Sequence, residues 1–334
     1  METYNFAIDL CAEHIAIYRA GQGVVLTEAP IVLLSGKGKN PKEIYCGDEA
    51  NELINKIEDC KVCYPTACGK ITDFDNAVIL VNNMLKKVED RSILKKRNLI
   101  FLVPCGLSKA DLDRYMDLGY ALSAKNVKLI PRVQAIARLN QKKDKLSNMY
   151  IVLNKDYFDI AVIYNNSIVR GYTIDLGYSI ITNNIERYIF ANKQAELDEK
   201  TLDEITFDLA TVIPNDSVEE KYTGLESYTK QAIDFKISSL EVVNYYTSYA
   251  CEVCDIIEAI MRTLSREIVA ELKVAGATIS GKIAKITGLT KFLSSRLNFD
   301  VIASEHDEYS ALLGVGSIMT DLGEIDKIAI DNKI

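Results

Sequence analysis

The sequence lacks a long apolar run and an excess of positive charge, and its opening residues predict no leader segment. Its longest apolar stretch, Val24–Leu34, is interrupted by a threonine, a glutamate and a proline, and a membrane-spanning helix needs roughly 20 successive apolar residues. The formal net charge of −8 offers no basic surface for nucleic acid. The opening METYNFAIDL runs directly into a strand pattern, which leaves no room for a signal peptide. We therefore expect a cytoplasmic protein with no nucleic-acid partner.

Cysteine and histidine are too scattered to predict a disulfide framework or a metal centre. The chain of 334 residues has eight cysteines and two histidines, and a cytosolic setting would keep the thiols reduced. Two pairs have CxxC spacing, Cys60–Cys63 and Cys251–Cys254, and the second lies in a helical pattern that puts both thiols on one face. We interpret the cysteines as buried thiols. Soft metal ligands at the first pair together with Cys68 are the alternative.

The strongest positive signal is an internal repeat. Residues 6–26 and 150–171 each contain three short β-rich runs joined by tight turns, and they match strand for strand and turn for turn. The two copies begin about half a chain apart, as in a duplicated unit. Two homologous halves would face each other across a cleft, with the first turn of each half meeting there.

Strand and helix patterns alternate after each copy of the repeat. The run NLIFLVPCG from Asn98 is apolar up to its turn, as in a buried parallel strand. Ser108 and Asp111 fit a capping box, and Asp73 or Asp75 suits the N-cap of an amphipathic helix. Strands that repeatedly feed helices predict an α/β fold with covered sheets. In the second half, we expect helices over 179–190, 240–272, 286–297 and 309–321, and a polar, loop-like insert over 215–236 with strand character near 228–237.

The order of these segments resembles the MreB-like proteins, the rod-shape-determining bacterial actins. The resemblance runs from Phe6 to about Leu322. It rests on IDL at Asp9 and, further along, on GQGVVLTEAPIVLL, CGDEANEL, GKITDFDNAV, LVPCGLSKADLDRY, KTLDEIT and ALLGVGSIM. It implies an actin-like fold, which is a duplicated ribonuclease H-like α/β unit. Two domains, each with a larger and a smaller subdomain, would surround a nucleotide cleft.

The resemblance also implies domain limits. We expect domain I over 1–147, with its smaller subdomain within about 28–75. Domain II would span 148–308, with its smaller subdomain within about 182–240. The remaining segment, 309–334, would form a C-terminal helix and tail that return to domain I.

The first turn of the implied nucleotide site departs from the family pattern. Relatives have Asp-Leu-Gly followed by Thr and small residues, whereas Asp9 and Leu10 here precede Cys11, Ala12 and Glu13. Asp9 keeps the position that relatives use to hold Mg²⁺ through water, so it is the candidate metal residue. A phosphate cradle needs glycine so that backbone N–H groups can approach the anion. The carboxylate of Glu13 would instead repel the phosphates.

The second turn departs further. Relatives have Asp-Ile-Gly-Gly-Gly-Thr, and the matching positions begin at Val152 and continue through Leu153 to Asn154, Lys155 and Asp156. The acid and all three glycines are therefore replaced.

Two more elements of the implied site are altered. The adenosine-side turn, Thr-Gly-Gly-Gly-Ala in relatives, matches residues 275–279, where Gly276 keeps a glycine and Ala277 and Thr278 do not. The family's water-activating Glu lies beside a Pro after a Leu-Ile strand, but here Pro131 is followed by Arg132 with no carboxylate. We therefore predict that ATP hydrolysis is lost or strongly weakened, and that no residue is catalytic.

Two hypotheses concern the replacement residues. Lys155 and Arg132 would meet phosphates if the site were rewired to keep ATP and Mg²⁺, although such side chains in loops are usually solvated. Alternatively, Lys155 would pair with Glu13 or Asp9 across the cleft and latch the domains without a nucleotide.

The resemblance predicts a bacterial actin-like cytoskeletal or scaffold protein of the MreB type, related to cell shape. It would self-associate into protofilaments or copolymerise with another actin-like protein. A divergent ATP-binding actin-like ATPase with a rewired phosphate site is the alternative. Peripheral contact with the inner face of the cell membrane stays open, because relatives use an N-terminal amphipathic helix or an apolar hairpin and no such helix precedes Phe6.

Overall fold

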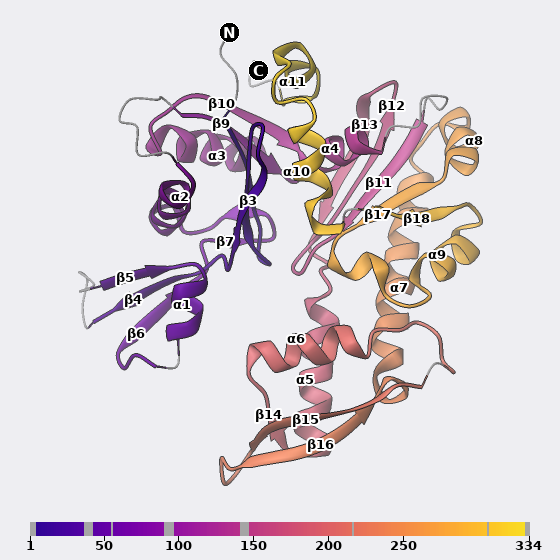
Figure 1. Ribbon diagram of the computed structural model, residues 1–334. Helices are drawn as coiled ribbons and strands as arrows, with labels where there is room; N and C mark the ends of the chain where they lie inside the picture. Colours follow the sequence, from indigo (N-terminus) through magenta and orange to yellow (C-terminus); the bar gives the residue numbers. More distant parts are fainter. Residues whose placement is uncertain are drawn as a thin grey trace.

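Two five-stranded sheets, one in each half of the chain, form the centres of the protein (Figure 1). The computed structural model describes residues 5–36, 43–54, 56–89, 97–140, 147–215, 217–305 and 307–330. Residues 141–146, just before the expected domain boundary between 147 and 148, lie outside this described part, as do residues 90–96. None of the described helices has the length and apolarity to cross a membrane.

The first sheet has the strand order β10-β9-β1-β2-β3. Its strands are β1 (Phe6–Leu10), β2 (Ile15–Arg19), β3 (Gly23–Glu28), β9 (Arg97–Val103) and β10 (Ala124–Pro131). The first three form the predicted antiparallel meander, and β9 and β10 add to β1 in parallel. Every residue of β9 after Arg97 is buried, which confirms the prediction of a buried parallel strand from its unbroken apolar run.

The second sheet repeats this plan with the order β13-β12-β11-β17-β18. Its strands are β11 (Ser147–Leu153), β12 (Phe158–Tyr164), β13 (Ser167–Ile174), β17 (Ala277–Ser280) and β18 (Val301–Ala303). As in the first half, the meander is antiparallel and two later strands join in parallel. The matching orders confirm the predicted duplication.

Two three-stranded sheets lie apart from the two large ones (Figure 1), and a short two-stranded pair lies beside the first large sheet. In the first half, β4 (Val32–Ser35) pairs with β5 (Glu43–Cys46) and β6 (Cys60–Cys63), and β7 (Thr66–Ala67) pairs with β8 (Lys70–Ile71). In the second half, β15 (Glu219–Glu226) lies between β14 (Ala195–Glu196) and β16 (Ala232–Ser238). The strand character expected near 228–237 is confirmed by β16, in which apolar and polar residues alternate. The rest of the predicted loop-like insert is largely β15, whose glutamates, lysine and glycine gave no clear strand pattern.

Each half of the chain also contributes helices. Those of the first half are α1 (Asp48–Leu53), α2 (Phe74–Val88), α3 (Lys109–Ala121) and α4 (Arg132–Leu139). Those of the second half are α5 (Ser179–Lys193), α6 (Glu199–Asp208), α7 (Ser239–Met261), α8 (Arg266–Ala275) and α9 (Leu289–Leu297). The predicted caps are confirmed, because Asp73 accepts from the Asn76 amide and Ser108 forms a capping box with Asp111. The long helical pattern 240–272 is divided into α7 and α8, with Ser265 capping the second.

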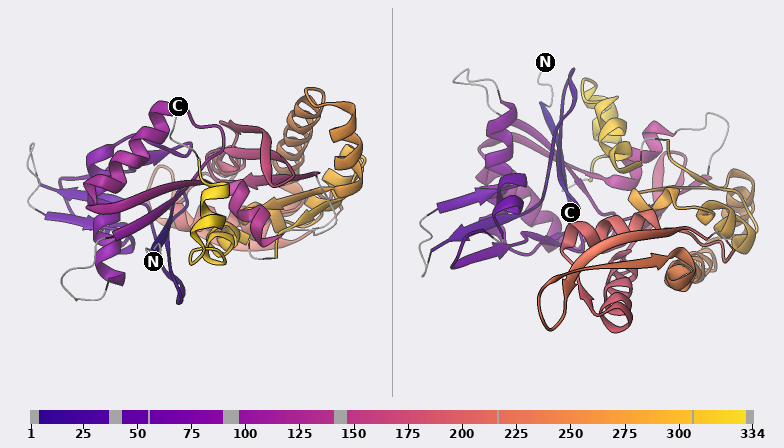
Figure 2. Two further views of the ribbon diagram at one scale, coloured as in Figure 1. Left: turned by 90° about the horizontal axis from the view of Figure 1, so that it is seen from above. Right: turned by 60° about the horizontal axis from the view of Figure 1, so that its bottom comes forward.

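The C-terminal segment packs against the cleft side of the first half. α10 (Ser310–Gly316) lies on α4, and a Cβ added at Gly314 would come within 1.9 Å of the Ala135 carbonyl oxygen, so this glycine allows the two helices to pack closely. The expected single helix over 309–321 ends at Gly316, and a further helix, α11 (Leu322–Ile328), follows. Figure 2 shows α10 between the two large sheets, and one apolar core includes side chains from both halves and from α10.

Candidate functional site: a buried ion pair where the two halves meet

The first turns of the two halves lie at corresponding ends of their sheets. Each is a tight reversal closed by a backbone hydrogen bond: the amide of Cys11 donates to the His14 carbonyl at 3.1 Å, and the amide of Asn154 donates to the Tyr157 carbonyl at 3.0 Å. β1 and β11 deliver these turns to the carboxyl ends of their parallel neighbours, where α/β sheets commonly carry their sites. The two predicted turns therefore do come together.

Arg132 joins the two turns. It is the first residue of α4, directly after β10, and it is only 3% exposed. Its guanidinium forms an ion pair with the Asp9 carboxylate, donates to the Tyr157 hydroxyl, and lies 3.3 Å from the Asn154 side-chain oxygen. Asp9 belongs to the first half, whereas Asn154 and Tyr157 belong to the second. One side chain thus bonds to both halves of the cleft.

The electrostatics keep Arg132 charged. Burial alone would lower the pKa of a guanidinium, but the Asp9 carboxylate beside it raises the pKa of Arg132 above its ordinary value. The prediction that Arg132 would be solvated is therefore wrong. Its place at the end of the buried strand β10, whose last three residues are all buried, carries the side chain inward.

Lys155 does not latch the domains. Its Nζ atom is 2.9 Å from a carboxylate oxygen of Glu199 on α6, within the second half, and its side chain keeps about a third of its exposure. The hypothesis that it pairs with Glu13 or Asp9 is wrong. Glu199, at the start of α6, supplies the carboxylate that lies within ion-pair distance of Lys155.

Glu13 and Asp156 each contact the opposite half in other ways. The Tyr178 hydroxyl donates to Glu13 at 2.6 Å, and burial raises the pKa of the Glu13 carboxyl although this bond and the positive charge of Arg132 lower it. Asp156 accepts from the backbone amide of Cys68, between β7 and β8, and burial also raises the pKa of Asp156. The first turn therefore reaches the second half through Glu13, and the second turn reaches the first half through Asp156.

A second cross-contact was missed by sequence reasoning. Asp159 on β12 is completely buried and accepts from the Cys105 amide at 3.1 Å and from the Thr173 hydroxyl at 2.7 Å. The Gly106 amide donates to the same hydroxyl at 2.9 Å. These bonds fasten the turn after β9 to the second sheet. The sequence did contain a signal for this contact, namely a lone aspartate within the apolar run FDIAVIY. A carboxylate in a buried strand is rare unless it has a partner, so its presence indicates one.

The predicted adenosine-side residues lie away from the cleft. Gly276 precedes β17, and Ala277 and Thr278 pair with Met149 and Tyr150 inside the second sheet. Gly281, at the opposite end of β17, packs so closely that an added Cβ would lie 2.2 Å from the Leu153 carbonyl oxygen. The cleft holds a small cavity and a wider pocket, both described below. Ser280 and Gly281 line the small cavity, whereas the residues from Gly276 to Thr278 line neither of the two.

A small cavity separates the two turns. Its volume is about 10 Å³, and Asp9, Glu13, Arg132 and Asn154 are among the residues that line it. This is room for about one water molecule. Arg132 Nε and Asn154 Nδ2 have no hydrogen-bond partner within the described ranges.

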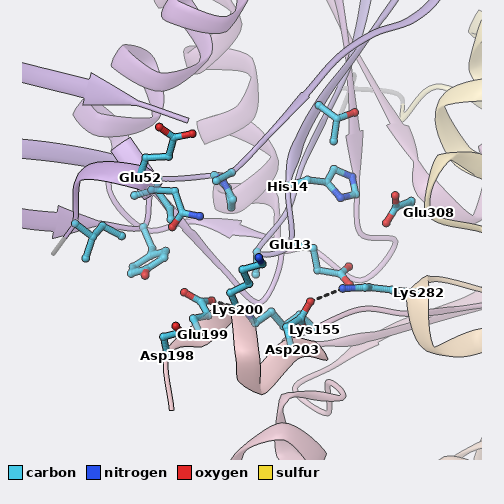
Figure 3. Close-up of a pocket in the computed structure, with 18 of the residues that line it drawn as sticks. Glu13, His14, Glu52, Lys155, Asp198, Glu199, Lys200, Asp203, Lys282 and Glu308 are labelled. Carbon is cyan, nitrogen blue, oxygen red and sulfur yellow. Dashed lines mark hydrogen bonds and ion pairs between the residues drawn. The ribbon is translucent and has the colours of Figure 1, made fainter. Parts of the chain in front are cut away.

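A wider pocket of about 600 Å³ opens beside the small cavity (Figure 3). Six carboxylates and three lysines line it: Glu13, Glu52, Asp198, Glu199, Asp203 and Glu308, with Lys155, Lys200 and Lys282. Each lysine already has an acidic neighbour. Lys155 pairs with Glu199, Lys282 lies 2.5 Å from Asp203, and Lys200 lies 3.7 Å from Glu204. The pocket therefore offers an anion a net negative lining.

These residues do not fit a magnesium–triphosphate group. Asp9, the candidate metal residue, is already neutralised by the Arg132 guanidinium. The space between the turns admits about one water, and the adjoining pocket has more carboxylates than lysines. Elsewhere in the described part of the chain, no group of three or more histidine, cysteine or acidic side chains is arranged to hold a metal ion.

Comparison with known proteins identifies relatives along the whole chain. The family described as MreB/Mbl protein matches residues 3–327. The cell shape-determining protein Mbl of Bacillus subtilis (strain 168) is 23% identical over 328 residues, which cover 97% of this chain and 98% of that protein. The cell shape-determining protein MreB of Escherichia coli (strain K12) is 22% identical over 315 residues, which cover 91% and 90%.

Solved structures show the same architecture. The crystal structure of MreB 5 of Spiroplasma citri bound to AMPPNP superposes with a TM-score of 0.86 at 18% identity and covers 98% of both chains. The MamK double helical filament gives 0.80 at 13% identity, over 95% of this chain and 99% of that one. The fold is therefore actin-like, as predicted.

Proposed function

Since the family match covers nearly the entire chain, the chain belongs to the MreB/Mbl family, and we propose that it is an actin-like cytoskeletal or scaffold protein of the cell-shape type that assembles without hydrolysing ATP. The observation that carries the second part is the buried Arg132–Asp9 ion pair. It occupies the carboxylate that the family resemblance assigns to Mg²⁺, and it brings a cation where the resemblance expects a water-activating carboxylate.

Assembly is the part supported by relatives. Mbl and MreB are named as cell shape-determining proteins, and MamK forms a double helical filament. We propose self-association into protofilaments for this chain, or copolymerisation with an intact actin-like relative. Loss of hydrolysis is compatible with either, because interfaces on outer subdomain surfaces do not need the cleft. Without hydrolysis, a filament would lack the chemical switch that reverses assembly.

Sedimentation and phosphate release test the two parts separately. The purified protein, at a series of concentrations, is pelleted with and without ATP–Mg²⁺, and the pellets are viewed by electron microscopy. We expect filaments whose amount is independent of nucleotide, and no phosphate release above a protein-free blank. Steady phosphate release that rises with protein concentration would overturn the loss of hydrolysis. Absence of filaments, both alone and with an added MreB relative, would overturn the assembly part.

A thermal unfolding scan with ATP–Mg²⁺ tests the alternative reading, a divergent ATPase that binds at the wider pocket through its lysines. A ligand present at about one hundred times its Kd stabilises the folded state by about 2.7 kcal/mol. We expect no such shift in Tm. Contact with the inner face of the cell membrane stays a prediction, and adding anionic vesicles to the same sedimentation assay would test it.

A further inference from the structure

The contacts at the bottom of the cleft form a continuous connection between the two halves. Arg132 and Asp9 come from the ends of β10 and β1 in the first sheet, and Asn154 and Tyr157 come from the turn after β11 in the second. Tyr157 is completely buried, and Asn154 is 5% exposed. Water therefore has little access to these bonds, and in such surroundings charge-assisted hydrogen bonds are about twice as strong as neutral ones.

The charges around Arg132 are unbalanced without it. Asp9 and Asp159 are buried carboxylates near the junction, and Asp156 lies in the second turn. Arg132 acts electrostatically on Asp156 and Asp159 as well as on Asp9. A buried carboxylate without a counter-charge is costly, so removing the guanidinium would leave like charges facing each other across the two halves.

The other cross-contacts lie around this centre. Glu13 meets Tyr178 on one side, and Cys105 with Gly106 meets Asp159 and Thr173 on the other. Farther from the cleft, an apolar core that includes Ala7, Ile130, Tyr150 and Val152 already joins the two sheets. This apolar core holds the two sheets together away from the cleft. The hydrogen bonds and the ion pair of Arg132 therefore determine how close the two turns lie at the cleft.

We infer that Arg132 is a built-in counter-ion that holds the two domains together at the cleft, so that their relative orientation is set by the protein alone and not by a bound ligand. The guanidinium supplies, from within the chain, the positive charge that links Asp9 to the opposite turn. All the contacts lie within one chain, so this inference does not depend on whether filaments form.

Hydrogen exchange on the dilute, unassembled protein tests the clamp. Arg132→Met keeps much of the side-chain length but removes the charge and the donors. We expect amide exchange to rise at least tenfold in the turns 11–14 and 154–157 and in the segment 104–106, while the strand interiors of both sheets keep their protection. Small-angle scattering should show a larger radius of gyration. Unchanged exchange in these turns and an unchanged radius would overturn the inference.

Two further variants separate the clamp from a general loss of stability. Lys155→Met removes a cation from the same turn whose ion pair, with Glu199, lies within the second half, and it should leave exchange across the junction unchanged. Arg132→Met combined with Asp9→Asn removes the uncompensated carboxylate, and it should recover part of the lost protection. Equal effects of Arg132→Met and Lys155→Met would contradict a specific role for Arg132.

The unmodified protein gives a test that needs no variant. Exchange in the two turns, measured with and without ATP–Mg²⁺, should be the same, because the clamp is complete without ligand. Ligand-induced protection of the turns would overturn the inference even if Arg132→Met failed to fold. Filament assays are kept apart from these measurements, so failure to assemble would count against the proposed function alone.

Discussion

Two of the ion pairs in the cleft differ in burial and in what they connect. Arg132 and Asp9 are 4% and 3% exposed in their side chains, and the guanidinium also bonds to the opposite half. Lys155 and Glu199 are 30% and 61% exposed and lie within one half. In both pairs, the cation lies in or against the turn 154–157. Since solvent screens the second pair and not the first, only the first should determine how the halves are held.

Removing the buried cation should have the largest effect. Arg132→Met leaves the Asp9 carboxylate buried without its counter-charge, and breaking a buried pair in this way typically costs about 3–5 kcal/mol. We expect a loss of that order in the free energy of unfolding, measured by urea denaturation. Arg132→Met with Asp9→Asn should lose less than the single variant. A double variant no more stable than the single one would show that the two side chains are not coupled.

Breaking the second junction should have an intermediate effect. Asp159→Ala leaves the Cys105 amide and the Thr173 hydroxyl without their acceptor, and an unsatisfied buried polar group costs about 1–3 kcal/mol. Urea denaturation of the variant gives the change. Thr173→Val removes one donor to Asp159 and the acceptor of the Gly106 amide but keeps the carboxylate; it is the matched control and should cost less. A larger loss for the control would indicate that packing, and not the carboxylate, fastens this turn.

The buried Glu13 should make stability depend on pH. Burial raises its folded pKa above the ordinary 4.5, so the folded state binds the proton more tightly than the unfolded chain does. Its contribution is therefore most favourable below the ordinary pKa and decreases as pH rises through the raised value. Glu13→Gln should remove this decrease. Free energies of unfolding for both proteins, followed from acid to neutral pH, should converge at low pH and diverge as pH rises.

Removing the exposed pair should have the smallest effect. Lys155→Met should change the free energy of unfolding by about 0–1 kcal/mol. The difference from the unmodified protein should shrink further as salt is added, because exposed charges are screened. Denaturation at low and high ionic strength measures this. A loss as large as that of Arg132→Met would remove the distinction between the two pairs.

Local patterns predicted most of the scaffold. The repeat at 6–26 and 150–171 indicated two equivalent meanders, and the apolar run after Asn98 indicated a buried parallel strand. The caps at Asp73 and Ser108 were also readable. The alternation in Ala232–Ser238 indicated strand β16, whereas its partner β15 was missed because its run of glutamates, a lysine and a glycine gave no clear strand pattern.

The sequence by itself determined the duplicated α/β framework and the two turns that meet in the cleft, because hydrophobic periodicity and turn residues act over short stretches of chain. It did not determine which cation joins those turns. Lys155 was the residue expected there, yet Arg132 forms the bond to a carboxylate 123 positions earlier in the chain. Only the convergence of β1, β10 and β11 in the tertiary structure decided this pairing, because it buries one side chain between the two halves and leaves the other facing solvent.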